Sequence, residues 1–109
     1  MITEINTKKG NYLIEFNNFN GTGWAKDVIA IMSEKIKPTS ISRREIEVGW
    51  DYSEYEYDIE NEGISFLFHI DDEGARYLLL EKKNITEANK EKLRAWAIII
   101  AEEVENLQK

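Results

Sequence analysis

The chain has 109 residues, of which 42% are hydrophobic and 32% charged, with a net charge of −7 and no cysteine. A chain of this length supports one ordinary core, so we expect a single domain over residues 1–109. The lack of cysteine excludes disulfides and thiolate zinc sites. The sequence opens with no signal-peptide pattern, and its apolar runs are too short to span a membrane, so we expect a cytoplasmic protein with no membrane partner.

The acidic residues are concentrated in one segment. Residues 45–75 contain eleven acids and neither Lys nor Arg, whereas the rest of the chain contains ten acids and all 14 basic residues. The acids alternate with large apolar residues, which is typical of one face of a sheet. Such a segment repels phosphate, so we expect no direct binding of nucleic acid; it favours a basic partner instead.

The first part of the chain predicts one strand and one helix. Residues 11–16 alternate in polarity as a short strand does. A turn-rich segment follows, and helical spacing then predicts a helix over residues 23–36, which Pro38 ends. The helical stripe consists of Trp24, Val28, Ile31 and Met32.

Four strands are predicted next, because the hydrophobic period changes to two. They cover residues 46–50, 54–60, 64–70 and about 77–80. Turn residues at 61–63 and 71–74 separate the last three strands, with a glycine in each turn. The last strand is apolar on both faces, as expected of a central strand.

The last segment predicts a long amphipathic helix with Thr86 as its N-cap. Ile98 and Ile99 widen its apolar stripe, so we expect this helix to be covered on more than one side. The stripe itself consists of Leu93, Trp96, Ala97, Ile100, Val104 and Leu107.

The predicted element order is therefore β-α-β-β-β-β-α. Strands joined by short turns form an antiparallel meander, and two helices packed on one face of it complete a two-layer α+β domain.

His69, the only histidine, is the main candidate for catalysis. A small hydrolase or metal-assisted enzyme would use it with Asp71 or Asp72 as the orienting carboxylate. No nucleophile motif surrounds any serine, and the acids at 71–73 lack the alternating spacing of a calcium loop. We therefore predict no catalytic residue, no metal site and no cofactor, and keep this enzyme as an alternative hypothesis.

Residues 50–58 alternate aromatic and acidic side chains. The pattern fits a strand pair with an aromatic inner face and a solvated acidic outer face, which also discourages aggregation at a sheet edge. It equally fits a protein-binding surface with tyrosine anchors and acidic rim charges. The predicted partner-binding residues are Asp51, Tyr52, Glu54, Tyr55, Glu56, Asp58 and Glu60.

The main functional hypothesis is a non-enzymatic protein-binding module, monomeric or homodimeric, that inhibits a basic protein such as a nuclease. In size, acidity and compactness the chain is similar to small bacterial toxin-immunity proteins. Two further alternatives are an acidic mimic of nucleic acid and a structural subunit that assembles through Ile98 and Ile99.

Overall fold

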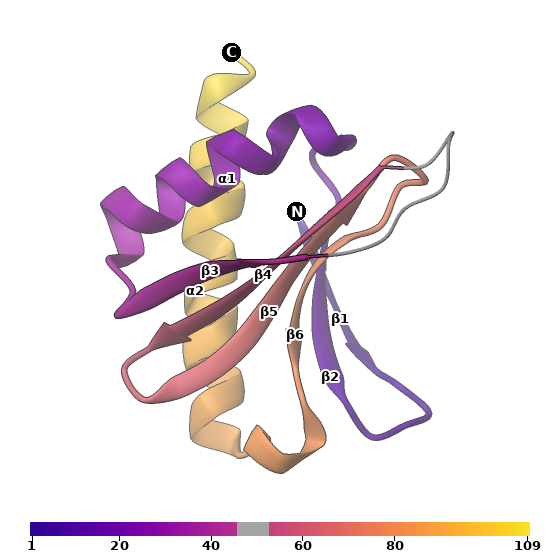
Figure 1. Cartoon of the computed structure of the whole chain (residues 1–109), viewed down its shortest axis with the longest axis vertical. Coiled ribbons are helices and arrows are strands. Elements are labelled where there is room, and N and C mark those ends of the chain that lie inside the picture. Colours follow the sequence, from indigo (N-terminus) through magenta and orange to yellow (C-terminus); the bar gives the residue numbers. More distant parts are fainter. Residues whose placement is uncertain (46–52) are drawn as a thin grey trace.

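A computed structural model describes residues 1–45 and 53–109. It shows a six-stranded antiparallel sheet with two helices packed on one face, which confirms the predicted two-layer α+β domain (Figure 1). The strands are β1 (Ile2–Asn6), β2 (Tyr12–Phe16), β3 (Ser40–Arg44), β4 (Glu54–Asn61), β5 (Ile64–Asp71) and β6 (Arg76–Leu80). The main helices are α1 (Ala25–Ile31) and α2 (Glu87–Leu107).

The spatial order of the strands is β1-β2-β6-β5-β4-β3. Strands β3 to β6 form a meander in which β4, β5 and β6 are three of the four predicted strands, and the hairpin β1–β2 lies on the other side of β6. Strand β6 lies between β2 and β5, which confirms the predicted central position. The sequence analysis missed β1. The strand predicted at 46–50 lies outside the described residues, and the strand that pairs with β4 on its outer side is β3.

One face of the sheet, here called the covered face, packs against the helices and forms the core. Alternate strand residues point to it, because side chains in a strand alternate between faces. Removing one aliphatic or aromatic side chain of this kind from water contributes about 1.5–3 kcal/mol. The fully buried side chains of the covered face are Tyr12, Ile14, Phe16, Phe68, Ile70, Leu78 and Leu80.

Both helices begin and end near their predicted limits. A short 3₁₀ turn (Thr22–Trp24) precedes α1 and a π turn (Met32–Ile36) continues it. The helical path ends at Lys37, which is left-handed with φ 54°, immediately before Pro38. At the start of α2, the Thr86 hydroxyl accepts a hydrogen bond of 3.0 Å from the Asn89 N–H, which confirms the predicted N-cap.

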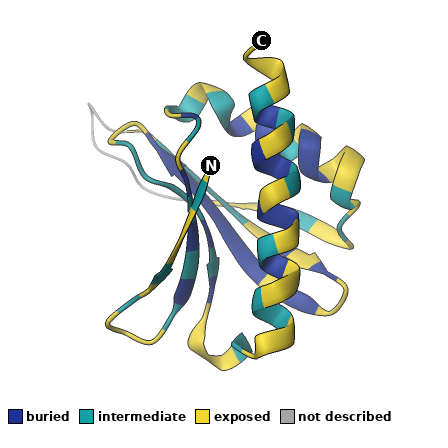
Figure 2. Cartoon of the chain, turned by 180° about the vertical axis from the view of Figure 1, so that it is seen from behind, coloured by how far each residue is buried: buried dark blue, intermediate teal, exposed yellow. Residues whose placement is uncertain are grey.

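Helix α2 buries one stripe and exposes the opposite side (Figure 2). The stripe runs from Leu93 to Val104, whereas Leu107 is 58% exposed and Ile98 is 38% exposed. The expectation that Ile98 is covered was therefore wrong, and so was the placement of Leu107 in the stripe. The physical reason is that the sheet lies on one side of α2 only. None of the described helices combines the length and the apolar character needed to cross a membrane.

Candidate functional site

The second face of the sheet, here called the open face, carries neither α1 nor α2 in the described part of the chain. The antiparallel register places one row of side chains across it, in the order Arg44, Glu56, His69, Tyr77 and Glu15. Basic residues of this face are few: Arg44 from β3, and Lys83 after β6. Its acids are Glu15, Glu54, Glu56, Asp58, Glu60, Asp71 and Glu81.

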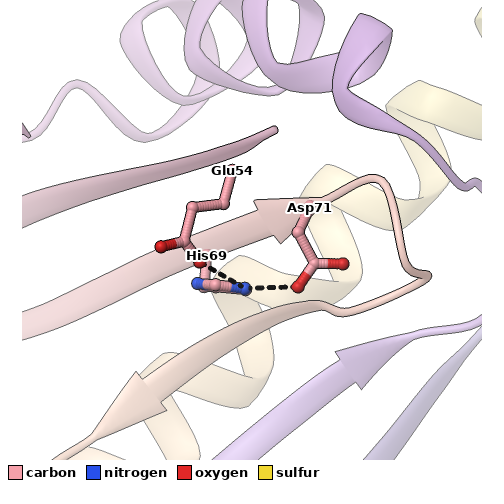
Figure 3. A group of neighbouring side chains, drawn as sticks. All are labelled: Glu54, His69 and Asp71. Atoms are coloured by element: carbon pink, nitrogen blue, oxygen red, sulfur yellow. Dashed lines mark hydrogen bonds and ion pairs between the residues drawn. The ribbon is translucent and has the colours of Figure 1, made fainter. Parts of the chain in front are cut away.

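His69 lies between carboxylates near the middle of the open face (Figure 3). Its Nδ1 is 2.8 Å from Oε2 of Glu56, directly across on β4. Its Nε2 is 2.8 Å from Oδ2 of Asp71 and 3.8 Å from Oε2 of Glu54. The imidazole stacks on the ring of Tyr77, with 4.9 Å between ring centroids, and the His69 side chain is only 8% exposed. Both ring nitrogens therefore face acids in a largely buried environment.

The turn after β5 fixes the carboxylate of Asp71. Its Oδ1 accepts hydrogen bonds from the backbone N–H groups of Glu73 at 3.0 Å and Ala75 at 2.9 Å. Gly74 supplies the positive φ of 102° that this turn needs, because glycine adopts this conformation without a Cβ clash. Oδ2 is thereby left to face the imidazole of His69. An aspartate at the end of β5 thus closes the turn and orients the histidine at once.

These neighbours shift the pKa of His69. Burial lowers the pKa of His69. The hydrogen bonds to Asp71 and Glu56, together with the charges of these two acids, raise it by more than burial lowers it, so the pKa lies above its ordinary 6.5. The same acids and burial raise the pKa of Tyr77, burial being the larger cause. A general base needs a neutral imidazole with a nitrogen free to accept a proton. The geometry of His69 favours holding a positive charge instead.

A hollow of about 300 Å³ lies on the same face, over the other half of β4 and β5. Leu67 and Leu79, which are opposite each other in the register, provide apolar side chains on this face. Carboxylates of Asp58, Glu60 and Glu81 surround them. An apolar floor with an acidic rim matches a lysine or arginine side chain, which has an aliphatic stem and a charged head. Further lining comes from Ser40, Ser42, Ser65, Lys83 and Asn84.

The structure brings together only some of the predicted partner-binding residues. The acids Glu54, Glu56, Asp58 and Glu60 share the open face, as their alternation predicts. The side chains of Glu54 and Glu56 are only 18% and 19% exposed and lie beside His69, so they are not the exposed rim charges that the sequence suggested. Of the remaining acids in this set, Asp58 and Glu60 are exposed, and Asp51 lies outside the described residues.

The predicted tyrosine anchors do not lie beside these acids. Tyr55 is opposite Ile70 on the covered face, where it is partly buried, and the Arg43 guanidinium lies 4.5 Å from the centre of its ring. Tyr52 lies outside the described residues. Among the described residues, the tyrosine on the open face is Tyr77, which was not among the predicted partner-binding residues. A partner on the acidic face would therefore contact Tyr77 and leave Tyr55 untouched.

The two carboxylates considered as partners of His69 have different positions. Asp71 contacts Nε2, as described above. Asp72 instead accepts a hydrogen bond of 3.1 Å from the Ser53 N–H, and its own N–H donates to the Ser53 carbonyl at 3.1 Å. These bonds tie the turn to the start of β4. Asp71, and not Asp72, is thus the acid placed to orient the histidine.

The position of the acids around His69 could have been predicted from the sequence. The turn at Glu62-Gly63 is a two-residue hairpin, because Asn61 pairs with Ile64. Counting back from this pair places residue 56 opposite 69 and residue 54 opposite 71. The turn alone therefore predicts which acids face the histidine.

Comparison with known proteins gave no match: no protein-family model, no curated protein and no solved structure resembles this chain significantly.

Proposed function

We propose that this protein is a non-enzymatic binding module that inhibits a basic protein, such as a nuclease, by covering it with the open face. One observation carries the proposal. Among the described residues, the open face carries seven acids against two basic residues, Arg44 and Lys83, and six of these acids lie at the hollow or beside His69. Charge of one sign on one face steers an oppositely charged partner and accelerates its association.

The hollow supplies a place for short-range contact. The aliphatic stem of a partner's arginine would lie over Leu67 and Leu79, and its guanidinium would meet Asp58 and Glu60. Asp58 already holds Arg44, whose Nη2 is 2.6 Å from Oδ1, which shows that a guanidinium fits this carboxylate. An arginine of the partner would form the same kind of contact from above the sheet.

A nuclease is a suitable target because its cleft must attract phosphate and is therefore basic. An acidic sheet face that fills such a cleft blocks the substrate by occupying the same charges. The class-level similarity to toxin-immunity proteins and the nucleic-acid mimic both lead to this mode of binding. They differ in the target, which would be a toxin in one case and a regulatory DNA- or RNA-binding protein in the other.

The test is capture of the partner followed by an assay of inhibition. Lysate is passed over the immobilised chain at low salt and at about 0.5 M, where the Debye length falls to a few ångströms. The variant Asp58→Lys/Glu60→Lys reverses two exposed acids of the open face. Its matched control, Glu91→Lys/Glu102→Lys, makes the same change in charge at exposed positions of α2.

The proposal expects a basic protein that is retained at low salt by the wild type and the control but lost by the open-face variant. The purified partner should lose its activity when the wild type is added and keep it with the variant. Retention that both reversals reduce equally would contradict the proposal, and so would a captured protein whose activity is unaffected.

A second candidate is the metal-assisted or hydrolytic enzyme. One observation favours it: the Asp71 carboxylate lies 2.8 Å from Nε2 of His69, where it can orient the imidazole. In that case His69→Asn would abolish turnover of a substrate and leave binding of a basic protein unchanged. Under the binding proposal the same variant leaves inhibition of the partner largely intact, because His69 does not line the hollow.

A further inference from the structure

We propose that Glu54, His69 and Asp71 bind a divalent transition metal of the zinc class. Each of the three residues offers one ligand atom, and these atoms all lie within 4.8 Å of one another (Figure 3). One nitrogen and two carboxylate oxygens form a common donor set for such ions. The three ligands lie on the same open face but do not line the hollow that we assign to a basic side chain of the partner.

The spacing of the atoms is close to what the ion requires. A tetrahedral zinc ion with bonds of about 2.0–2.1 Å holds its ligand atoms about 3.3 Å apart. Nε2 of His69 lies 2.8 Å from the Asp71 oxygen and 3.8 Å from the Glu54 oxygen, which brackets that spacing. The Glu54 and Asp71 oxygens lie within 4.8 Å of each other, so adjustment of these two side chains would complete three sides of the coordination sphere, with water as the fourth ligand.

Neighbouring groups fix the positions of two of the ligands, His69 and Asp71. Glu56 lies 2.8 Å from Nδ1, so it can accept the Nδ1–H and leave the lone pair of Nε2 directed at the site. A carboxylate behind a ligating histidine is the usual outer partner in zinc sites, because it fixes the ring and increases its basicity. Backbone N–H groups hold Asp71, and the ring of Tyr77 holds the imidazole plane. The site therefore needs little reorganisation to accept an ion.

The charges of the site also suit a cation. The carboxylates of Glu54, Glu56 and Asp71 and the imidazole of His69 lie together at positions that are buried or nearly so. Buried charges are stable when they are paired or coordinate a metal. A divalent ion is one counter-charge that such a group of carboxylates accepts.

The donor set also predicts selectivity. Ca²⁺ takes six to eight oxygen ligands, and Mg²⁺ keeps several waters and demands octahedral geometry. An imidazole nitrogen with two carboxylates suits Zn²⁺ or Co²⁺ better than either of these ions. We therefore expect Zn²⁺ to bind at one equivalent per chain in the presence of excess Mg²⁺.

The experiment uses the full chain, stripped of metal, titrated with Zn²⁺ in a calorimeter and with Co²⁺ in a spectrophotometer. Four variants are compared with the wild type. Glu54→Gln and His69→Asn each remove a ligand, and Glu56→Gln weakens the support behind the histidine. Glu60→Gln is the matched control, because it removes the same charge from the same face of β4 outside the site.

We expect saturable binding of one Zn²⁺ by the wild type and by Glu60→Gln, with visible Co²⁺ bands of low coordination number. His69→Asn should lose both signals and Glu54→Gln should bind more weakly. Glu56→Gln should lower the affinity about 10- to 100-fold. If circular dichroism shows that His69→Asn does not fold, the comparison of Glu54→Gln with Glu60→Gln decides.

Two results would overturn the assignment. The first is a wild type that binds no Zn²⁺ saturably, which would mean that the three residues do not form a metal site. The second is equal weakening by Glu54→Gln and Glu60→Gln, which would indicate diffuse attraction to the acidic face. Neither result bears on capture of a basic partner, whose test depends on Asp58 and Glu60 at the hollow.

Discussion

The covered and open faces are built from the same strands, but their side chains differ in burial and in chemical type. On β6, Leu78 points to the covered face and is fully buried, while its neighbour Leu79 points to the open face and is half-buried. An antiparallel sheet can pack one face on a core and leave the other to solvent. Alternation along a strand thus separates the residues that stabilise the fold from those available for binding.

Burial alone does not distinguish the two faces. His69 and Asp71 are as buried as several core residues, yet both lie on the open face. What differs is the kind of group that is buried. The covered face buries mainly apolar side chains that fill space, whereas the open face buries, besides Leu67, ionisable groups that need a counter-charge. A buried ionisable cluster outside the core is therefore the structural feature that distinguishes the two faces.

The largest expected effect tests this division on adjacent residues. Leu78→Ala leaves a cavity in the core and should lower the free energy of unfolding by about 2–5 kcal/mol. Leu79→Ala removes the same atoms from a site that solvent reaches, so we expect a loss of about 1 kcal/mol. Urea denaturation measures both. Equal losses would mean that the open face is packed as tightly as the core, and the comparison would fail.

A second prediction concerns a polar contact on the covered side. The Tyr12 hydroxyl donates to the Glu4 carboxylate, which also accepts from Arg94, whose Nη2 is 2.7 Å away. Because a hydrogen bond to a charged group is stronger than a neutral one, Tyr12→Phe should cost about 1–2 kcal/mol near neutral pH.

The pH dependence of this cost has a definite sign. Burial, and then the hydrogen bond to Glu4, raise the pKa of Tyr12 to about 12, above its ordinary 10. The folded protein thus holds this proton more tightly than the unfolded chain does. The stabilisation is fully present below pH 10 and is lost as the pH rises towards 12. The difference between wild type and Tyr12→Phe should therefore shrink in urea unfolding at increasing pH; a difference that grows with pH would contradict the assignment.

Local patterns predicted most of the fold but not the arrangement of the site. Period-two alternation, the Gly63 and Gly74 turns and the Thr86 cap act over a few residues, and the structure confirms them. Strand β1 was missed because Ile2–Asn6 has only two apolar residues and depends on pairing with β2. The faces of Tyr55 and Glu56 followed from alternation, but the contact of Glu56 with His69 required the register across the hairpin. Contacts between strands are determined by pairing, which composition and periodicity leave open.

A third prediction concerns the start of α2, which packs on the covered face. Thr86→Ala removes the side-chain acceptor of the Asn89 N–H and should cost about 1 kcal/mol of stability. Thr86→Ser is the control, because it keeps the hydroxyl and should restore most of the loss. Thermal unfolding followed by circular dichroism measures both. An alanine variant as stable as the wild type would show that packing alone positions the start of α2.

The smallest expected effect lies on the outer side of α2, where the layered structure ends. Ile98 is 38% exposed, whereas Ile100, two residues later, is fully buried against the sheet. If the chain acts as a monomer, Ile98→Ser should change the free energy of unfolding by less than about 0.5 kcal/mol, as is usual for exposed positions. Light scattering coupled to size-exclusion chromatography should then give the same mass for both proteins. A wild type that is dimeric, and a variant that is monomeric and less stable, would mean instead that a second copy covers α2. The helix would then have two buried sides, as its wide apolar stripe predicts.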